Sequence, residues 1–162
     1  SDSNYGMVMR TLFAISQPSG DRVFRMEAEK PDRAAASARY EALLPERIDV
    51  LLLGLGTDGH IASLFPNSQA LCSTQRAVLP VEECSAAHPR LSITRKVIDN
   101  AEAIFLLAPG EAKGRVLAKA LRPPMEDFMS LPVRLAMRGT WLLDEAAARQ
   151  LAELDSENAQ HN

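Results

Sequence analysis

The chain has 162 residues, of which 46% are hydrophobic, and a formal net charge of −3. This length and composition are typical of one globular domain with a normal core. The acidic balance argues against a general nucleic-acid binder, which carries a basic face. No apolar run approaches the roughly 20 residues that a membrane span needs, and no signal-peptide pattern is visible. We therefore expect neither a nucleic-acid nor a membrane partner.

The two cysteines, Cys72 and Cys84, do not form a CxxC pair and have no ligand partners at metal-binding spacing. They are interpreted as reduced thiols, which is typical of a cytoplasmic protein. The sequence therefore predicts no metal site.

The sequence pattern of the first half of the chain predicts two helices and two strands. In the first helix the apolar residues recur on one face, and proline at the start of the second suits a first helical turn. In chain order the elements are a helix capped by Asp2 or Ser3 and reaching about Ala14, a short strand at 22–26, a helix introduced by Pro31 and running over 33–44, and a buried strand at 48–53.

The second half predicts further strands that alternate with helices. The elements are an extended segment at 76–82 with Pro80 at an edge or irregular position, a short extended piece at 90–94, a buried strand at 103–108, a helix over 112–121 that Pro123 and Pro124 end, an irregular or helical stretch at 125–137, a strand at 139–143, and a helix capped by Asp144. Such alternation indicates an α/β fold with a mostly parallel sheet covered by helices on both faces. We expect one domain over 1–155 and a polar tail over 156–162.

A glycine-rich segment directly follows the strand predicted at 48–53. Its sequence is Gly54-Leu55-Gly56-Thr57-Asp58-Gly59-His60, so a carboxylate and an imidazole stand two residues apart at a strand end. In open α/β sheets ligands bind at the carboxyl ends of the strands. This segment is therefore the strongest candidate for a functional site.

Three interpretations of this segment are possible. Gly54, Gly56 and Gly59 satisfy the G-x-G-x-x-G pattern of dinucleotide-binding proteins. However, Pro66 interrupts any helix within seven residues of Gly59, and Asp58 would place a negative charge beside the phosphates. The context that a dinucleotide site requires is therefore missing.

The second interpretation is structural: the glycines permit a tight turn, Asp58 bonds to loop amides, and His60 is an ordinary polar residue. The third is catalytic. A histidine accepts a proton from water near neutral pH, and a nearby carboxylate orients its ring. Backbone amides of such a loop can also stabilise developing negative charge. The residues alone leave these two interpretations open.

The segment from Gly54 to Pro66 closely resembles the signature of the 6-phosphogluconolactonases, and the resemblance extends over residues 1 to about 146. Four further segments resemble motifs of this family, which also includes the glucosamine-6-phosphate deaminases. They are Asp2-Ser3-Asn4-Tyr5-Gly6, Arg90-Leu91-Ser92-Ile93-Thr94, Gly110-Glu111-Ala112-Lys113 and Thr140-Trp141-Leu142-Leu143-Asp144.

The resemblance implies a Rossmann-like fold and hydrolysis of 6-phospho-D-glucono-1,5-lactone, a phosphosugar lactone of the pentose phosphate pathway. It makes His60 the general base that activates water, with Asp58 beside it. It also implies that the substrate and its phosphate are bound by Gly56, Gly59, Arg90, Lys113 and Asn4. No metal or organic cofactor is implied, and the sequence does not indicate the oligomeric state.

Two alternatives remain from other functional classes. The deaminases share the Asp-Gly-His core, but their loop continues Ala-Phe-Asn-Glu-Pro, with a glutamate that assists ring opening. The corresponding residues 62–66 of this chain are Ala-Ser-Leu-Phe-Pro, which favours the lactonase, although Ile61 is a mild departure toward the deaminases. The second alternative is a non-catalytic sugar-phosphate sensor domain, which would not need the pair Asp58 and His60.

Members of the family have a further N-terminal portion with a Ser-Gly-Gly phosphate loop and an Asp-Glu-Arg segment. Neither motif is found in this sequence, which begins at Ser1. We expect the sequence to be a fragment of a longer protein, with an incomplete sheet and weak or no lactonase activity when isolated.

Overall fold

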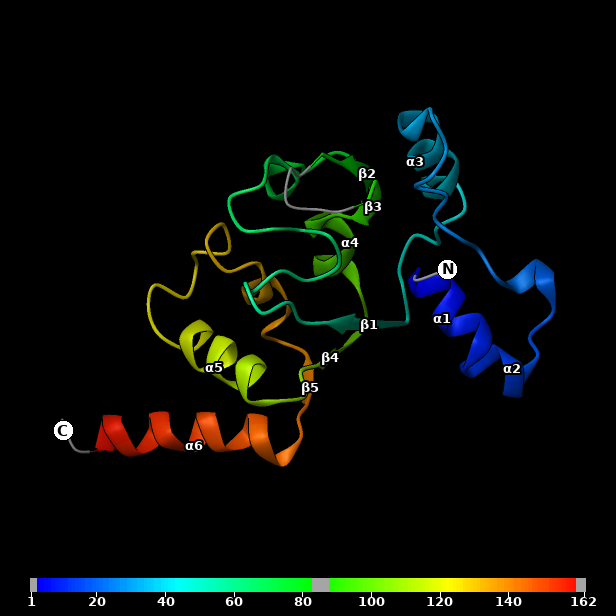
Figure 1. Ribbon diagram of the computed structural model, residues 1–162. Helices are drawn as coiled ribbons and strands as arrows, with labels where there is room; N and C mark the ends of the chain where they lie inside the picture. Colours follow the sequence, from blue (N-terminus) through cyan, green and yellow to red (C-terminus); the bar gives the residue numbers. More distant parts are fainter. Residues whose placement is uncertain (1–2, 83–87, 160–162) are drawn as a thin grey trace.

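The computed structural model describes residues 3–82 and 88–159, and it places a parallel sheet among helices (Figure 1). Within these residues the sheet has the strand order β1-β4-β5. The three strands are β1 (Val50–Gly54), β4 (Ala103–Leu107) and β5 (Thr140–Leu142). Leu52 of β1 is in register with Phe105 of β4, which is in register with Thr140 of β5. The predicted α/β class with a mostly parallel sheet is confirmed.

One face of this sheet carries the core. Leu51 and Leu53 of β1 and Ile104 and Leu106 of β4 are buried in one cluster. The elements that supply the rest of the cluster include α4 (Arg95–Asn100), α5 (Glu111–Ala120) and the 3-10 helix η3 (Pro132–Ala136). The helix α6 (Glu145–Ala159) packs against α5 on the same side of the sheet (Figure 1).

The opposite face of the sheet is exposed within the described residues, which corrects the expectation of cover on both faces. Val50 and Leu52 are 60% and 62% exposed, and Leu107 and Leu142 of the neighbouring strands are also exposed. The burial of β1 consequently alternates along the strand, although its sequence is an apolar run of the kind seen in fully buried strands. The reason is that no described helix packs over Leu52 and its neighbours.

A second, antiparallel pair of strands lies beside the main sheet. It consists of β2 (Val78–Val81) and β3 (Arg90–Ile93), and α3 (Arg33–Glu41) packs on β2. Pro80 lacks an amide proton, and a two-stranded ribbon has only edges, so the predicted edge position is confirmed. A small 3-10 helix, η2 (Gln69–Cys72), precedes this pair.

The N-terminal segment forms α1 (Asn4–Arg10), α2 (Leu12–Ser16) and a short 3-10 helix, η1 (Gly20–Arg22). The predicted first helix is thus confirmed with one interruption at Thr11. The hydroxyl of Thr11 donates to the carbonyl of Met7 at 2.9 Å, and such back-bonding competes with the regular helix. Ser3 caps the helix by accepting from the Gly6 amide, as predicted.

One prediction of secondary structure was wrong, and one helix was missed. The segment 22–26 alternates like a strand but forms none, because the described residues offer no neighbouring strand for its backbone groups. The helix α4 was not predicted, since six residues are too few to show a helical repeat.

The remaining elements form close to the predicted positions. The helix α3 ends at Glu41, three residues earlier than expected, and α6 runs to Ala159, through the first residues of the expected polar tail. Cys84 lies outside the described residues. No helix of the described part is long and apolar enough to cross a membrane.

The crossing of α5 and α6 depends on a glycine. A Cβ at Gly114 would overlap the carbonyl oxygen of Ala147 and lie 2.8 Å from its Cα, and these neighbours are backbone atoms. We expect Gly114→Ala to lower the free energy of unfolding by about 1–3 kcal/mol, the usual cost of overpacking. Alanine's better helix propensity, about 1 kcal/mol, offsets only part of this cost.

Urea denaturation measures the change. Gly20→Ala is the matched control, because no atom lies within 4 Å of its added Cβ. We expect the control to change stability by no more than about 0.5 kcal/mol. Equal stabilities of the two variants would contradict the close helix crossing.

Candidate active site

The glycine-rich segment forms a tight turn at the carboxyl end of β1. The Gly56 amide donates to the carbonyl of His60 at 2.8 Å, and the Gly59 amide donates to the carbonyl of Gly56 at 3.1 Å. Gly59 has a φ of +93°, a conformation that side-chain-bearing residues rarely adopt. The following residues turn again and form no long helix. This geometry agrees with the rejection of a dinucleotide site.

The turn holds the side chains of Asp58 and His60 together. Asp58 Oδ1 and His60 Nδ1 are 2.6 Å apart, and the same oxygen accepts from the His60 backbone amide at 3.1 Å. An ionised carboxylate can only accept, so the hydrogen bond requires the ring proton on Nδ1. In the neutral ring Nε2 then keeps its lone pair. The predicted pairing of Asp58 with His60 is therefore present in the geometry.

The acidity of Asp58 follows from the same contacts. Partial burial alone would raise the pKa of its carboxyl group, but hydrogen bonds from the backbone and ring of His60, together with the attraction of the imidazole, outweigh it. The pKa of Asp58 is consequently held below its ordinary value. The Asp58 carboxylate is thus ionised near neutral pH.

Two glycines of the turn leave room for neighbouring side chains. A Cβ at Gly56 would overlap His60 Nδ1 and Asp58 Oδ1. A Cβ at Gly59 would lie 2.7 Å from Leu131 Cδ2, and the Gly59 carbonyl accepts from the Val133 amide at 2.9 Å. The geometry therefore gives both glycines a steric role and fixes the turn against the segment that leads into η3.

The loop that follows His60 is held against β3 by a hydrogen bond. The Ser63 amide donates to the Ser92 hydroxyl at 3.1 Å. Farther along the loop, the Phe65 ring lies 4.7 Å from the His60 ring, between centroids, and 5.8 Å from the guanidinium carbon of Arg90. These contacts bring Arg90, predicted from its resemblance to a family motif, close to the turn.

Arg90 has few partners of its own. Its Nε is buried without a hydrogen-bond partner, and no carboxylate of residues 3–82 or 88–159 is seen to pair with it. In contrast, Arg33, Arg76 and Arg95 each form an ion pair. An uncompensated guanidinium is suited to an anion from outside the chain.

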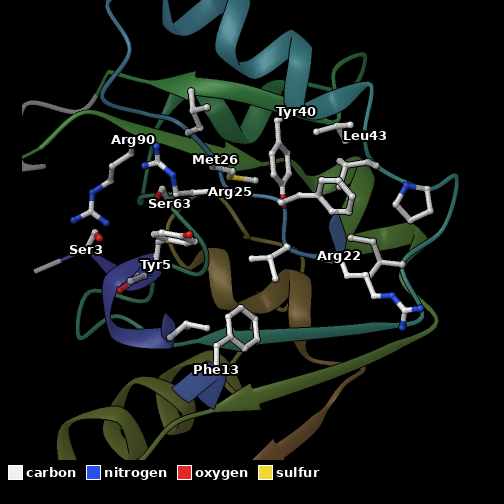
Figure 2. A pocket seen from close by; sticks show the side chains of 18 of the residues that line it. Ser3, Tyr5, Phe13, Arg22, Arg25, Met26, Tyr40, Leu43, Ser63 and Arg90 are labelled. Atoms are coloured by element: carbon white, nitrogen blue, oxygen red, sulfur yellow. The ribbon is translucent and has the colours of Figure 1, made fainter. Parts of the chain in front are cut away.

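Arg90 also lines a large cavity between the N-terminal helices, α3 and β1. The cavity has a volume of ≈ 1090 Å³, and its lining includes Asn4 and Ser63. In Figure 2 Arg90, Ser63 and Ser3 lie at one end, with Arg22 and Leu43 at the other. The structure thus brings together two predicted residues, Asn4 and Arg90. The lining does not include His60, Asp58 or Lys113.

Lys113 lies in the first turn of α5, as predicted. The helix begins after Gly110, whose amide donates to both carboxylate oxygens of Asp144 at 2.9 Å. Hydrogen bonds from Gly110 and from the Ala147 amide hold the pKa of Asp144 below its ordinary value. In the described part of the chain no carboxylate is seen to pair with the half-buried Lys113. No contact joins Lys113 to Arg90 there either.

The position of α5 relative to the turn follows from a neighbouring residue. Val116 lies one turn after Lys113. Its Cγ1 is 3.8 Å from the position that a Cβ added to Gly59 would occupy. The start of α5 therefore lies over the same edge of the sheet as His60.

Sequence reasoning missed three residues that organise this site. Asp144 was predicted only as a helix cap, yet it also holds the start of α5. No pattern in the sequence pointed to a role for Ser92 or Phe65. The partner of Ser92 is distant in sequence, and the neighbours of Phe65 come together only when the loop folds. Among residues 3–82 and 88–159, no three His, Cys, Asp or Glu side chains gather so that they could hold a metal ion.

Comparison with known proteins identifies the family. The family model of the glucosamine-6-phosphate isomerases/6-phosphogluconolactonase matches residues 1–143. The chain belongs to this family. Its members include the 6-phosphogluconolactonase of Haemophilus influenzae, to which the chain is 32% identical over 93% of its own length. The 6-phosphogluconolactonase of Streptomyces coelicolor is 37% identical over 82% of the chain.

The fold agrees with solved structures of the family. The crystal structure of devB protein matches 93% of the chain with a TM-score of 0.81 and 26% identity. The chain covers 68% of that protein, 67% of the Haemophilus relative and 54% of the Streptomyces relative. It therefore spans between half and about two thirds of the length of these relatives.

The depressed pKa of Asp58 predicts a pH dependence of stability. The folded state binds this proton less readily than the unfolded state, whose aspartate pKa is about 3.9. The stabilisation is therefore complete above the unfolded pKa and is lost as the pH falls through the folded pKa. We expect acid to lower the free energy of unfolding more steeply in the wild type than in Asp58→Asn. Urea denaturation between pH 6 and pH 3 measures both, and parallel curves would contradict the Asp58–His60 contact.

Proposed function

We propose that this chain carries the catalytic turn of a 6-phosphogluconolactonase, which hydrolyses 6-phospho-D-glucono-1,5-lactone to 6-phospho-D-gluconate. The observation that supports this most strongly is the 2.6 Å contact between Asp58 Oδ1 and His60 Nδ1. It orients an imidazole with a free Nε2 at the end of a parallel strand, which is the arrangement that a general base needs. The curated relatives described above are both named 6-phosphogluconolactonase.

In the proposed reaction His60 acts on water. Nε2 takes a proton from water while the water oxygen attacks the lactone carbonyl, and the imidazolium that forms is stabilised by the Asp58 carboxylate. The tetrahedral intermediate then collapses: the ring C–O bond breaks, and the leaving oxygen takes the proton back from His60. A positioned general base contributes about 10²–10⁴-fold. The reaction moves only protons and water, so it requires no redox cofactor.

The phosphate of the substrate requires cations, and we assign this role to Arg90 and Lys113. Arg90 offers a planar fork for two phosphate oxygens, and Lys113 offers a point charge near the free amides of the α5 N-terminus. Asn4 shares a cavity with Arg90, which supports its assignment to substrate binding. Gly56 and Gly59 are assigned to the substrate-facing backbone of the turn. The proposal also includes action in the cytoplasm.

The two alternative functions lack comparable support. A deaminase uses a glutamate in the loop after the histidine, and the loop from Ile61 to Pro66 contains none. A sugar-phosphate sensor needs phosphate-binding residues, but it gives no reason for the hydrogen bond between Asp58 and His60. The lactonase uses both the anion-binding residues and the oriented imidazole.

Replacing the base tests the proposal. In the full-length protein we expect His60→Ala to lower kcat for the phosphorylated lactone by about 10²–10⁴-fold, because the substitution removes the proposed general base. Binding of 6-phosphogluconate should persist, since the cations remain. Initial rates of acid release, corrected for spontaneous hydrolysis, measure turnover, and titration calorimetry measures binding.

His88→Ala is the matched control, because His88 is exposed and has no role in the proposed site. It should keep wild-type turnover. A wild type that binds the phosphosugar without hydrolysing the lactone would favour the sensor, and release of ammonia from glucosamine-6-phosphate would favour the deaminase. If His60→Ala keeps its turnover, His60 is not the base.

A further inference from the structure

A single aromatic ring contacts both the proposed base and one of the proposed phosphate-binding cations. The Phe65 ring lies 4.7 Å from the His60 imidazole, with an angle of 44° between the planes. The Arg90 guanidinium lies over the same ring, 5.8 Å from its centroid. Neither the glycine turn nor the family motifs assign a role to Phe65.

We propose that Phe65 is a positioning residue that sets the orientation of His60 and of Arg90 toward one phosphosugar. The inference rests on the proposed function and adds a residue that touches neither the water nor the phosphate. Phe65 acts through its two neighbours: the tilted ring contact fixes the imidazole plane, and the ring face holds the guanidinium.

The ring is itself held rigidly, which a positioning residue must be. Its side chain is buried, at 9% exposure. Its carbonyl accepts from the Ser68 amide at 3.1 Å, and the preceding part of the loop is tied to β3 by the bond between Ser63 and Ser92. The ring therefore has little freedom to move relative to the turn or to β3.

His60 needs a second contact besides Asp58. The hydrogen bond to Asp58 fixes the position of Nδ1, but one bond still permits the ring to tilt about it. The tilted aromatic contact removes that freedom, and such ring pairs contribute about 0.5–1.5 kcal/mol beyond their burial. Together the two contacts determine where Nε2 points.

Arg90 depends on the ring in another way. Its buried Nε has no hydrogen-bond partner, so the Phe65 face is its favourable contact within the described part of the chain. A cation over an aromatic face is stabilised without using its N–H groups. The terminal nitrogens are therefore left to bind an anion in a bidentate way.

The two groups lie close enough to act on one substrate. The His60 imidazole and the Arg90 guanidinium both lie close to the Phe65 ring, so the distance between them cannot exceed the sum of these two distances. In the 1,5-lactone the ring oxygen joins the carbonyl carbon C1 to C5, and C5 carries C6 with its phosphate, so the carbonyl and the phosphate lie on the same side of the sugar ring. Phe65 thus couples the base to the phosphate site.

The test uses Phe65→Leu in the full-length protein, which keeps an apolar side chain and removes the ring. We expect kcat to fall about fivefold or more for both 6-phosphogluconolactone and unphosphorylated glucono-1,5-lactone, because His60 is less well oriented. KM should rise about fivefold for the phosphorylated lactone alone, because only that substrate uses Arg90. Phe65→Tyr keeps the ring and should restore both constants to within about twofold.

Phe128→Leu is the matched control, because it removes another ring under an arginine, with Arg95 at 4.6 Å from its centroid, outside the proposed site. A merely structural effect would lower the thermal stability of both leucine variants and leave KM unchanged. If Phe65→Leu does not fold, Phe65→Met replaces it. The inference is overturned if the kinetic constants match those of Phe128→Leu, or if KM rises equally for both lactones.

Titration calorimetry with 6-phosphogluconate distinguishes a failure of the proposed role of Phe65 from a failure of the proposed lactonase function. A wild type that binds the product but hydrolyses neither lactone refutes the lactonase. In that case a fivefold weaker binding by Phe65→Leu still supports the contact of the ring with Arg90, and unchanged binding refutes it.

Discussion

The hydrogen bond between Asp58 and His60 is the interaction on which the site depends. It forms because two residues at i and i+2 of a tight turn point to the same side, where the missing side chain of Gly56 leaves room for them. The carboxylate can only accept, so it determines which ring nitrogen carries the proton. The same contact that lowers the pKa of Asp58 therefore also leaves Nε2 available as a base.

Four elements of the fold support this pair. The strand β1 supplies a rigid end, the Val133 amide binds the carbonyl of Gly59, and β3 holds the following loop through Ser92. Val116 of the helix α5 lies near Gly59 of the turn, and Asp144 fixes the start of that helix. The site is therefore an assembly of parts from the whole chain, whereas its chemistry is concentrated in one short turn.

Much of this could be predicted from the sequence, because the information is local. Apolar runs predicted β1 and β4, proline and glycine predicted the boundaries of α5, and the spacing of Asp58 and His60 predicted their pairing. What could not be predicted depends on tertiary neighbours. The segment 22–26 has a strand pattern but no partner strand in the described residues, and Leu52 is apolar but exposed. Phe65 approaches His60 and Arg90 only when the loop folds against β3.

The position of the proton on the His60 ring is the most direct measure of the hydrogen bond with Asp58. Long-range ¹H–¹⁵N NMR of the full-length protein at neutral pH distinguishes a protonated ring nitrogen from an unprotonated one, and His60→Ala identifies the signals. We expect a single tautomer with the proton on Nδ1 and a free Nε2, and we expect Gly56→Ala to abolish this preference because its Cβ displaces the pair. A proton on Nε2 in the wild type, or rapid averaging of the two tautomers, would contradict this expectation.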